Sequence, residues 1–353
     1  MPKDYHVQRD EQVIKRTRAI KECLPKFCNL FFVGIENRTS ALTRLNYAYD
    51  LRIFFDYVYN NLLTSLDSKS FVVSDLDKIT AMDIEAYLSY LSYYQFDGKD
   101  CRCSESGKSR KLATVRSFFT YYFDKDLISS NVATKVKMPK KREKPIVRLD
   151  KDEIGKLIDQ VELGTGLSKH QAAYHDKLRH RDTAIITLLL GTGIRISECV
   201  GLNKQDIDFD NNSFLVTRKG GNKVILYFNN EVKAGLLDYL AWLNDQKEQG
   251  TDLASKITDT NAFFVSTQGT RLSVRAIQDL VKKYAKIITP LKKISPHKLR
   301  STFGTEAYRQ TRDIYVVADL LGHRDVNTTK KHYAAIDDEL RKEAAQSIKL
   351  IKD

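Results

Sequence analysis

The stretch 137–148 (KMPKKREKPIVR) constrains the fold of this chain more than any other. Its two prolines and its cluster of lysines and arginines are typical of an extended linker. A chain of 353 residues is also long enough for two domains, each with its own core. We therefore expect a helical extension at 1–36, a first domain at 37–136, the linker at 137–148 and a second domain at 149–353.

The first half has the apolar spacing of α-helices. Helical periodicity predicts helices over 8–23 and 43–63, and Thr80 with Asp83 has the pattern of a capping box that opens a helix through Tyr94. A further helix is predicted over 108–123 (KSRKLATVRSFFTYYF). This last helix is expected to turn its aromatic side chains inward, namely Phe118, Phe119, Tyr122 and Phe123.

Basic residues gather on the opposite side of that helix and in the linker. The 58 Lys and Arg against 45 Asp and Glu give a net charge of +13, which favours a polyanionic partner. An unspecific cationic surface is the competing interpretation. The candidate DNA-contacting residues are Lys108, Arg110, Lys111, Arg116, Lys140, Lys141 and Arg142.

The second half contains a helix that must stop abruptly. The stretch 182–202 (DTAIITLLLGTGIRISECVGL) predicts an apolar helix, a Gly-Thr-Gly stop and a second short helix from near Ile194. On that second helix, Arg195 and Glu198 lie one turn apart and can share a face. A guanidinium fork matches two non-bridging oxygens of a phosphate, whereas a surface ion pair is the competing interpretation.

A β-hairpin is predicted next. Two runs of β-branched and aromatic residues in 213–228 (SFLVTRKGGNKVILYF) flank a glycine-bearing turn. Lys219 lies at this turn, where it could reach a ligand. Lysines at such turns are more often simply solvated.

The segment 295–304 (SPHKLRSTFG) predicts a helix begun by Ser295 and Pro296. His297 and Arg300 are three residues apart and share a face of that helix. Two groups that are positive or can become positive repel each other unless an anion lies between them. An oxyanion ligand is therefore the favoured interpretation.

The last segment with this chemistry is 320–333 (LLGHRDVNTTKKHY). A helix ending at Gly322 is followed by His323, and either of two threonines could cap a helix that carries Tyr333. Tyr333 has little packing role in so polar a segment, which favours a chemical role. The competing interpretation is a structural one, because the chain has 18 tyrosines and any single one of them is more often structural than catalytic.

In this order, the motifs GTGIRISE, RKGG, PHKLR and LLGH…Y resemble the tyrosine recombinase (phage integrase) family over essentially the whole second half. The first domain resembles the helical core-binding domain of that family, mainly through SRKLATVRSFF. The resemblance implies a mainly α fold with a small antiparallel β-sheet in the catalytic domain, and two domains that form a C-shaped clamp around DNA. It also implies a terminal helix, at about 337–353, that docks on a neighbouring protomer.

The same resemblance implies the roles of the phosphate-facing residues. Tyr333 attacks the scissile phosphate and forms a 3′-phosphotyrosyl intermediate, with no need for ATP. Arg195 and Arg300 hold the non-bridging oxygens, and His323 hydrogen-bonds one of them. Ten positions separate His323 from Tyr333, one more than is usual in the family.

The proton-transfer roles follow in the same way. Lys219 is implied as the general acid, His297 as the general base, and Glu198 as the residue that orients Arg195. No metal and no cofactor are implied, because two arginines and a lysine supply the charge that Mg²⁺ supplies elsewhere.

The implied function is an enzyme, a site-specific DNA recombinase acting through a Holliday junction. Its partner is double-stranded DNA with inverted-repeat core sites, bound by a homo-tetramer that is a monomer or weak oligomer off DNA, with room for a regulatory partner protein. Two biological roles stay open: the Xer-like resolution of chromosome dimers, and the integration and excision of a mobile element. The alternatives are a type IB topoisomerase-like strand transferase and a DNA-binding protein that has lost catalysis.

Other features bear on compartment and surface. Five cysteines, no signal peptide and no membrane-spanning apolar run lead us to expect reduced thiols in a cytoplasmic protein. The family resemblance further implies a prokaryotic protein associated with the nucleoid. Cys101 and Cys103 alone are too few for a metal site. Relative to compact members of the family, the stretch 163–180 (LGTGLSKHQAAYHDKLRH) is an insertion. We expect a solvated loop there, and contact of its His and Lys residues with DNA or a neighbouring subunit is the competing interpretation.

Overall fold

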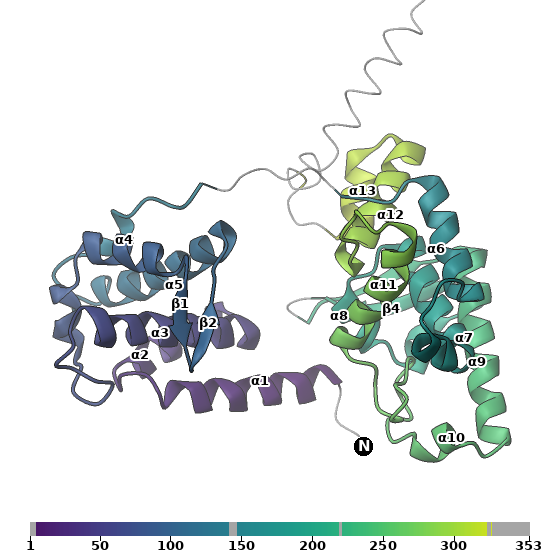
Figure 1. Ribbon diagram of the computed structural model, residues 1–353, viewed down its shortest axis with the longest axis horizontal. Helices are drawn as coiled ribbons and strands as arrows, with labels where there is room; N and C mark the ends of the chain where they lie inside the picture. The colour runs from purple at the N-terminus through teal and green to yellow at the C-terminus, as the bar shows by residue number, and fades with distance from the viewer. Residues whose placement is uncertain (1–4, 141–146, 219–220, 323–325, 327–353) are drawn as a thin grey trace, which may run out of the picture. The chain divides into compact units, whose positions relative to one another are not determined.

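A computed structural model describes residues 5–140, 147–218, 221–322 and 326 of the protein. The chain divides into two compact units, Met1–Lys144 and Pro145–Asp353 (Figure 1). The division falls within the stretch 137–148, where the linker is expected. Both units are mainly helical; the first also carries a two-stranded hairpin and the second a three-stranded antiparallel sheet. The predicted fold class, mainly α with a small antiparallel sheet in the second half, is confirmed.

Two helices of the first unit have side-chain caps at their starts. Ser40 accepts a hydrogen bond from the Thr43 backbone N–H, and Thr80 forms the predicted capping box with Asp83. The helices expected over 8–23, 43–63 and 108–123 are confirmed. The α-helices and strands described in this unit are α1 (Tyr5–Lys21), α2 (Cys28–Gly34), α3 (Ala41–Asn61), α4 (Ala81–Tyr90), β1 (Tyr94–Phe96), β2 (Lys99–Cys101) and α5 (Glu105–Phe123).

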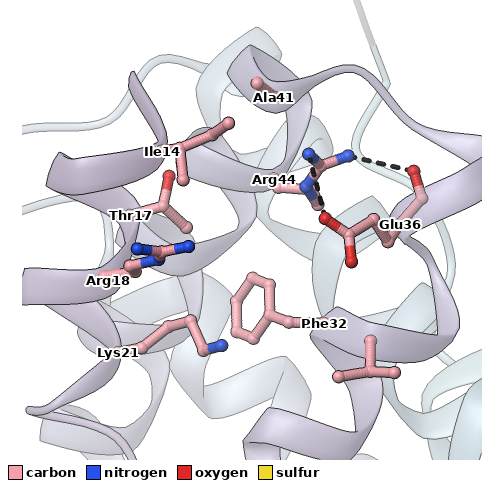
Figure 2. A pocket seen from close by; sticks show the side chains of 9 residues that line it. Ile14, Thr17, Arg18, Lys21, Phe32, Glu36, Ala41 and Arg44 are labelled. Carbon is pink, nitrogen blue, oxygen red and sulfur yellow. Dashed lines mark hydrogen bonds and ion pairs between the residues drawn. The ribbon is translucent and has the colours of Figure 1, made fainter. Parts of the chain in front are cut away.

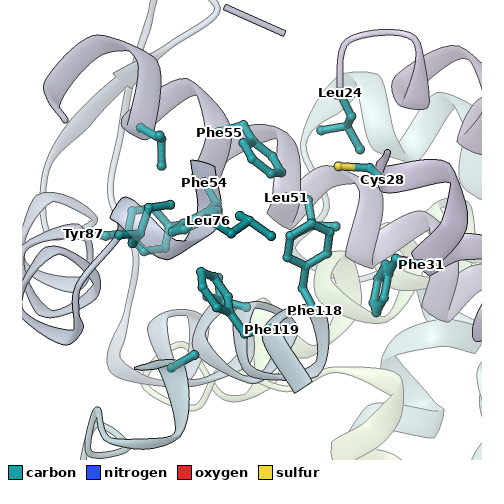
Figure 3. Close-up of a cluster of buried hydrophobic side chains, with 14 of the residues drawn as sticks. Leu24, Cys28, Phe31, Leu51, Phe54, Phe55, Leu76, Tyr87, Phe118 and Phe119 are labelled. Atoms are coloured by element: carbon teal, nitrogen blue, oxygen red, sulfur yellow. The ribbon is translucent and has the colours of Figure 1, made fainter. Parts of the chain in front are cut away.

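Aromatic side chains form the core of the first unit (Figure 3). Phe55 of α3 meets Phe118 of α5 edge to face, with ring centroids 5.7 Å apart. Phe31 of α2 lies against the same Phe118 ring at 5.2 Å. Because Phe31 is fully buried here, the segment before α3 shares the core of the helices that follow it.

The helix predicted through Tyr94 is wrong at its end. It stops at Tyr90, and Tyr94 instead starts β1, which pairs antiparallel with β2. The reason is the Asp97-Gly98 pair, in which both residues have positive φ (51° and 69°). Asp-Gly is a preferred turn for a two-residue hairpin, and this local signal prevails over the helical periodicity before it.

The inward position expected for Phe123 is also wrong, since this side chain is 43% exposed while Phe118, Phe119 and Tyr122 are fully buried. The helical geometry explains the difference. At about 100° per residue, Phe123 points about 90° away from the middle of the stripe formed by the other three rings.

The second unit adds a small sheet to its helices. Strands β3, β4 and β5 pair antiparallel in that order, and the β4–β5 register places Val216 opposite Val224. The elements described here are α6 (Lys151–Leu163), α7 (Lys169–Thr192), α8 (Ile196–Gly201), β3 (Ile207–Asp208), β4 (Ser213–Thr217), β5 (Lys223–Tyr227), α9 (Asn230–Glu248), α10 (Asp252–Lys256), α11 (Val274–Ile288), α12 (Pro296–Thr311) and α13 (Ile314–Leu321).

Helix α7 is the centre of the second unit, where it packs against α6, α9 and α12. Its buried Asp182 accepts hydrogen bonds from Tyr284 Oη at 3.0 Å and Lys283 Nζ at 3.2 Å, both on α11. Arg181 also pairs with this carboxylate, at 2.8 Å. These contacts satisfy a charge that burial alone would disfavour, and they fix the helix that leads into the candidate site.

The expectation of a solvated loop at 163–180 is wrong for most of that stretch, because α7 starts at Lys169. Ser168 and Gln171 form a capping box that begins the helix. His175 is buried, and its Nε2 lies 2.8 Å from the carbonyl oxygen of Val161. The inserted stretch therefore extends the central helix.

Across the described ranges, we find no helix with both the length and the apolar composition to cross a membrane.

Candidate active site

Arg195 stands at the beginning of α8. The preceding helix α7 ends at Gly193, whose left-handed conformation (φ 60°, ψ 21°) turns the chain sharply, as the Gly-Thr-Gly stop predicts. Helix α8 begins at Ile196, so Arg195 is its N-cap and not a residue within it. This placement corrects the predicted start near Ile194 by two residues.

Arg195 and Glu198 are in direct contact in the structure. The Arg195 Nη1 lies 2.9 Å from Glu198 Oε1, and the Arg195 backbone N–H donates to Oε2 at 3.0 Å. Glu198 is buried, whereas 37% of the Arg195 side chain is exposed. The carboxylate thus holds the guanidinium from one side, while part of the Arg195 side chain stays accessible to a ligand.

Arg300 comes from α12, which begins at Ser295 and Pro296 as predicted. The side chain is buried, with 6% exposed. It donates hydrogen bonds to two backbone carbonyl oxygens, of Gly193 and of Leu321. The residue therefore connects the end of α7 with the end of α13.

His297 lies one turn before Arg300 on the same helix but is exposed. The predicted spacing is thus realised on one helix, with the guanidinium inside and the imidazole at the surface. An exposed imidazole keeps access to protons from solvent, which suits a group that is to exchange one.

The two arginines meet at the last turn of α13. Arg195 Nη2 donates to the carbonyl oxygen of Gly322 at 3.0 Å, while Arg300 donates to that of Leu321, the residue before it. Gly322 ends the helix in the left-handed conformation (φ 59°), as predicted. Two guanidiniums that reach adjacent carbonyls from different elements can together bind an oxyanion such as a phosphodiester.

The predicted hairpin is formed by β4 and β5. Arg218 closes its turn, since its backbone N–H donates to Asn222 O at 2.8 Å and its carbonyl accepts from Gly221 N–H at 3.0 Å. Lys219 lies outside the described residues, as do His323 and Tyr333. The assigned roles of these three residues stay predictions.

Two residues near the arginines of the candidate site, Arg218 and Cys199, have no role in the sequence-based prediction. Arg218 packs against Gly322, where a Cβ would overlap its guanidinium. The sequence TRKGG shows a cation beside Lys219 but not this contact, which joins distant parts of the chain. Cys199 is buried directly after Glu198, and burial, together with that carboxylate, raises the pKa of the thiol to about 12.

The cations predicted to contact DNA in the first unit have partners within it. Lys111 is buried and lies 2.9 Å from Asp50 Oδ1, and Arg110 Nη1 lies 2.6 Å from Asp50 Oδ2. Lys108 Nζ is 3.2 Å from Glu105, and Arg116 donates to backbone carbonyls. The Arg110 side chain is 51% exposed and so retains the surface access that a phosphate contact needs.

In the linker, Lys140 is exposed, whereas Lys141 and Arg142 lie outside the described residues. Their role as DNA contacts stays a prediction.

The first unit also has a pocket between α1, α2 and α3, lined by Arg18, Lys21, Phe32 and Arg44 among others (Figure 2). Arg44 is held by the carbonyls of Glu36 and Thr39, at 3.0 and 2.6 Å. Burial lowers the pKa of Lys21. None of these residues belongs to the predicted catalytic set.

Within the described ranges, no cluster of three or more His, Cys, Asp or Glu side chains has an arrangement that could hold a metal ion.

Comparisons with known proteins identify the family of this chain. The model of the phage integrase family matches residues 147–339. The tyrosine recombinase XerC of Caldanaerobacter subterraneus subsp. tengcongensis is 31% identical over 96% of this chain and 90% of its own length. The XerC of Oceanobacillus iheyensis is 30% identical over 88% of this chain and 91% of its own length.

Solved structures share the fold. A XerH site-specific recombinase bound to palindromic difH substrate superposes with a TM-score of 0.64 at 19% identity, covering 88% of this chain and 81% of that one. A lambda integrase dimer bound to a core site gives a TM-score of 0.57 at 18% identity, with coverage of 87% and 93%.

These findings define an enzyme that cleaves and transfers DNA strands, a site-specific DNA recombinase. The chain belongs to the phage integrase family of tyrosine recombinases.

Proposed function

We propose that this recombinase cuts and rejoins duplex DNA without a metal, through a covalent bond between Tyr333 and the 3′-phosphate of the DNA. The observation that carries the proposal is the meeting of Arg195 and Arg300 at the last turn of α13. There, two guanidiniums can bind the non-bridging oxygens of one phosphate and stabilise the charge that grows in the transition state. Buried Glu198 keeps one of the two guanidiniums aligned.

The chemistry is a pair of transesterifications. The Tyr333 oxygen forms a bond to phosphorus as the bond to the 5′-oxygen breaks, so the phosphodiester energy is retained in the new ester. His297 takes the tyrosine proton, Lys219 gives a proton to the departing 5′-oxygen, and His323 hydrogen-bonds a phosphate oxygen. The 5′-hydroxyl of another strand then attacks the phosphotyrosine and reverses these proton movements.

The partner in this proposal is double-stranded DNA. The net charge of +13 supports it, and related recombinases of the same fold have been solved on DNA. Two subunits act on each core site and four on a pair of sites, through the terminal helix at about 337–353, which lies outside the described residues. Action on the chromosome places the protein in the cytoplasm, at the nucleoid.

A plasmid assay tests this function against the alternatives. Supercoiled DNA carrying two copies of the cognate site is incubated with protein in EDTA. Recombinase activity gives products whose size depends on the relative orientation of the sites, whereas a topoisomerase only relaxes the plasmid and a protein without catalysis leaves it unchanged. Relaxation without recombinant products would contradict the proposal.

The biological role depends on where the cognate site lies. Mapping the covalent adducts across the genome of the source cell distinguishes the two roles. Adducts at one chromosomal site where sister chromosomes join indicate dimer resolution. Adducts at the ends of an inserted element indicate integration and excision.

A further inference from the structure

The pocket between α1, α2 and α3 belongs to the first unit, whereas the candidate active site belongs to the second (Figure 2). Its volume is about 190 Å³. A cavity of about 150 Å³ holds one benzene molecule, so this pocket has room for a side chain of a partner. Helix α1, from the extension at 1–36, lines it with Arg18 and Lys21. That helix has no role in the proposed strand transfer.

The charges that line the pocket are unbalanced. Arg18, Lys21 and Arg44 stand against one lining carboxylate, that of Glu36. Figure 2 shows Glu36 beside Arg44, whose Nη2 lies 3.7 Å from Glu36 Oε1, while Arg18 and Lys21 come from α1 on the opposite side. Among the described residues, no carboxylate forms an ion pair with Arg18 or Lys21. The α1 side of the pocket therefore offers two cations to an anion from outside.

Lys21 lies where its charge is disfavoured. Burial lowers the pKa of Lys21, and the nearby Arg18 charge lowers it further, although Glu36 opposes this. The Lys21 Nζ lies 5.2 Å from the centroid of the Phe32 ring, within the range of a cation–π contact. A partly buried ammonium without an ion-pair partner among the described residues costs free energy on folding. Such a cost is typical of a group that serves a binding site.

Apolar side chains lie beside these cations. The Phe32 ring lines the pocket, and its neighbour Val33 lines it too although 68% of that residue is exposed. Leu30, three residues before Val33 on α2, is 53% exposed and can share its face. A DNA backbone offers phosphates but little apolar surface to cover this face. A protein segment with an acidic residue next to an apolar one matches both the charge and the apolar surface.

We propose that this pocket binds an acidic segment of a partner protein, with an Asp or Glu carboxylate between Arg18 and Lys21 and a neighbouring apolar side chain against Phe32 and Val33. The two cations of α1 attract the carboxylate, and the exposed apolar side chains of α2 are covered by its neighbour. The inference goes beyond the proposed function and does not depend on the chemistry of the second unit.

The test uses capped dipeptides as minimal probes of the full-length protein. Acetyl-Phe-Glu-amide carries both features, acetyl-Phe-Gln-amide lacks the charge, and acetyl-Ser-Glu-amide lacks the apolar side chain. A short DNA duplex without a core site is the fourth probe. Binding is followed through the methyl NMR signals of Ile14 and Val33, which line the pocket. The variants are Arg18→Gln and Lys21→Met, and the control Lys69→Met removes an exposed lysine outside the pocket.

We expect acetyl-Phe-Glu-amide to bind wild type with a Kd of about 0.1–10 mM, the range open to so small a ligand. The other two dipeptides are expected to bind wild type at least about 10-fold more weakly, because each lacks one of the two interactions. The same loss is expected for acetyl-Phe-Glu-amide with Arg18→Gln and with Lys21→Met, whereas Lys69→Met binds it like wild type.

Three results would overturn the proposal. The first is the absence of a saturable shift with acetyl-Phe-Glu-amide up to about 10 mM. The second is equal binding of either of the other dipeptides, or undiminished binding by the Arg18 and Lys21 variants. The third is the same shift on addition of the DNA duplex, which would make the pocket a phosphate site.

A second measurement separates binding from folding and needs no ligand. Lys21→Met keeps an unbranched side chain of similar length and removes its charge, so its urea midpoint is expected to equal or exceed that of wild type. A lower midpoint would show that the ammonium stabilises the fold, and it would contradict a role in binding. Because neither measurement involves DNA cleavage, a failure here is distinguishable from a failure of the proposed function.

Discussion

At the scale of single residues, Glu198 is the clearest supporting group of the site. It is buried, and its two oxygens hold both the backbone and the guanidinium of Arg195. A hydrogen bond to a charged group contributes about 1.5–3 kcal/mol. Because this energy aligns Arg195 in the proposed mechanism, its loss is expected to raise the free energy of the transition state.

Glu198→Gln keeps the shape of the side chain and removes its charge. We expect the single-turnover cleavage rate to fall by about 10- to 100-fold, which corresponds to the loss of one charge-assisted hydrogen bond. The matched control is Glu231→Gln, at an exposed position in the first turn of α9. Equal rates for the two variants would show that Glu198 does not orient Arg195 for catalysis.

Cys199, beside Glu198, makes the stability of the second unit depend on pH. Burial, and then the Glu198 charge, raise its pKa to about 12, so the folded state keeps the thiol protonated where the unfolded chain loses the proton. The unfolded state binds fewer protons above about pH 9. The contribution to stability is therefore complete below pH 9 and is lost as the pH rises towards 12.

We expect the free energy of unfolding to fall by about 1 kcal/mol per pH unit more in wild type than in Cys199→Ala between pH 9 and 11. Urea unfolding followed by the fluorescence of Trp242, the single tryptophan, reports on this unit. Other titrating groups contribute equally to the free energy of unfolding of both proteins, so their contributions cancel in the difference. Parallel curves for the two proteins would contradict the expected thiol pKa.

At the scale of elements, the ends of helices shape the site. Gly193 ends α7 with positive φ, lies against Phe303 of α12, and offers its carbonyl to Arg300. Gly322 plays the corresponding part at the end of α13. Both turns place carbonyl groups where the arginines reach them.

Gly193→Ala tests this arrangement. Its Cβ would lie 3.0 Å from Phe303 Cγ and nearer to Cδ1, in a conformation that costs an alanine about 1–2 kcal/mol. We expect a loss of at least that stability together with reduced cleavage. The control is Gly155→Ala in α6, where a Cβ meets nothing within 4 Å and where alanine is expected to stabilise the helix by about 1 kcal/mol. A Gly193→Ala protein as stable as wild type would contradict this view of the turn.

Local chemistry explains which elements could be predicted from the sequence. The β4–β5 hairpin, the start of α12 at Ser295-Pro296 and the helix stops at Gly193 and Gly322 all depend on a few adjacent residues. The β1–β2 hairpin was missed although Asp97-Gly98 signals it, because a helical period preceded it. The start of α7 falls inside the stretch 163–180, where the glycines and polar residues favour a loop although Ser168 and Gln171 form a capping box.

At the scale of the whole molecule, contacts between distant residues were out of reach of the sequence. Arg195 and the Gly322 carbonyl are 127 positions apart, and Lys111 and Asp50 are 61 apart. No local pattern shows that the first pair joins the site or that the second takes a cation into the interior. The family resemblance predicted that Arg195 and Arg300 lie close together, but not that they meet at the last turn of α13.

The division into two units suits a protein that must hold a long, highly charged partner. The excess of cations spreads over the whole chain, yet in the first unit several of them are neutralised internally, as Lys111 is by Asp50. The net charge therefore overstates the number of cations free to contact phosphates. The proposed catalytic residues all lie in the second unit, where the family match also lies.

The central claim is that Tyr333 forms a covalent bond with DNA at the site of Arg195 and Arg300. The most direct measurement incubates wild type and Tyr333→Phe, in EDTA, with nicked suicide substrates that carry the cognate site, and resolves the products on a denaturing gel. We predict an adduct with wild type, mapped by mass spectrometry to the peptide containing Tyr333, and none with the variant, whose other residues still bind the DNA. An adduct of equal yield with Tyr333→Phe would contradict the account.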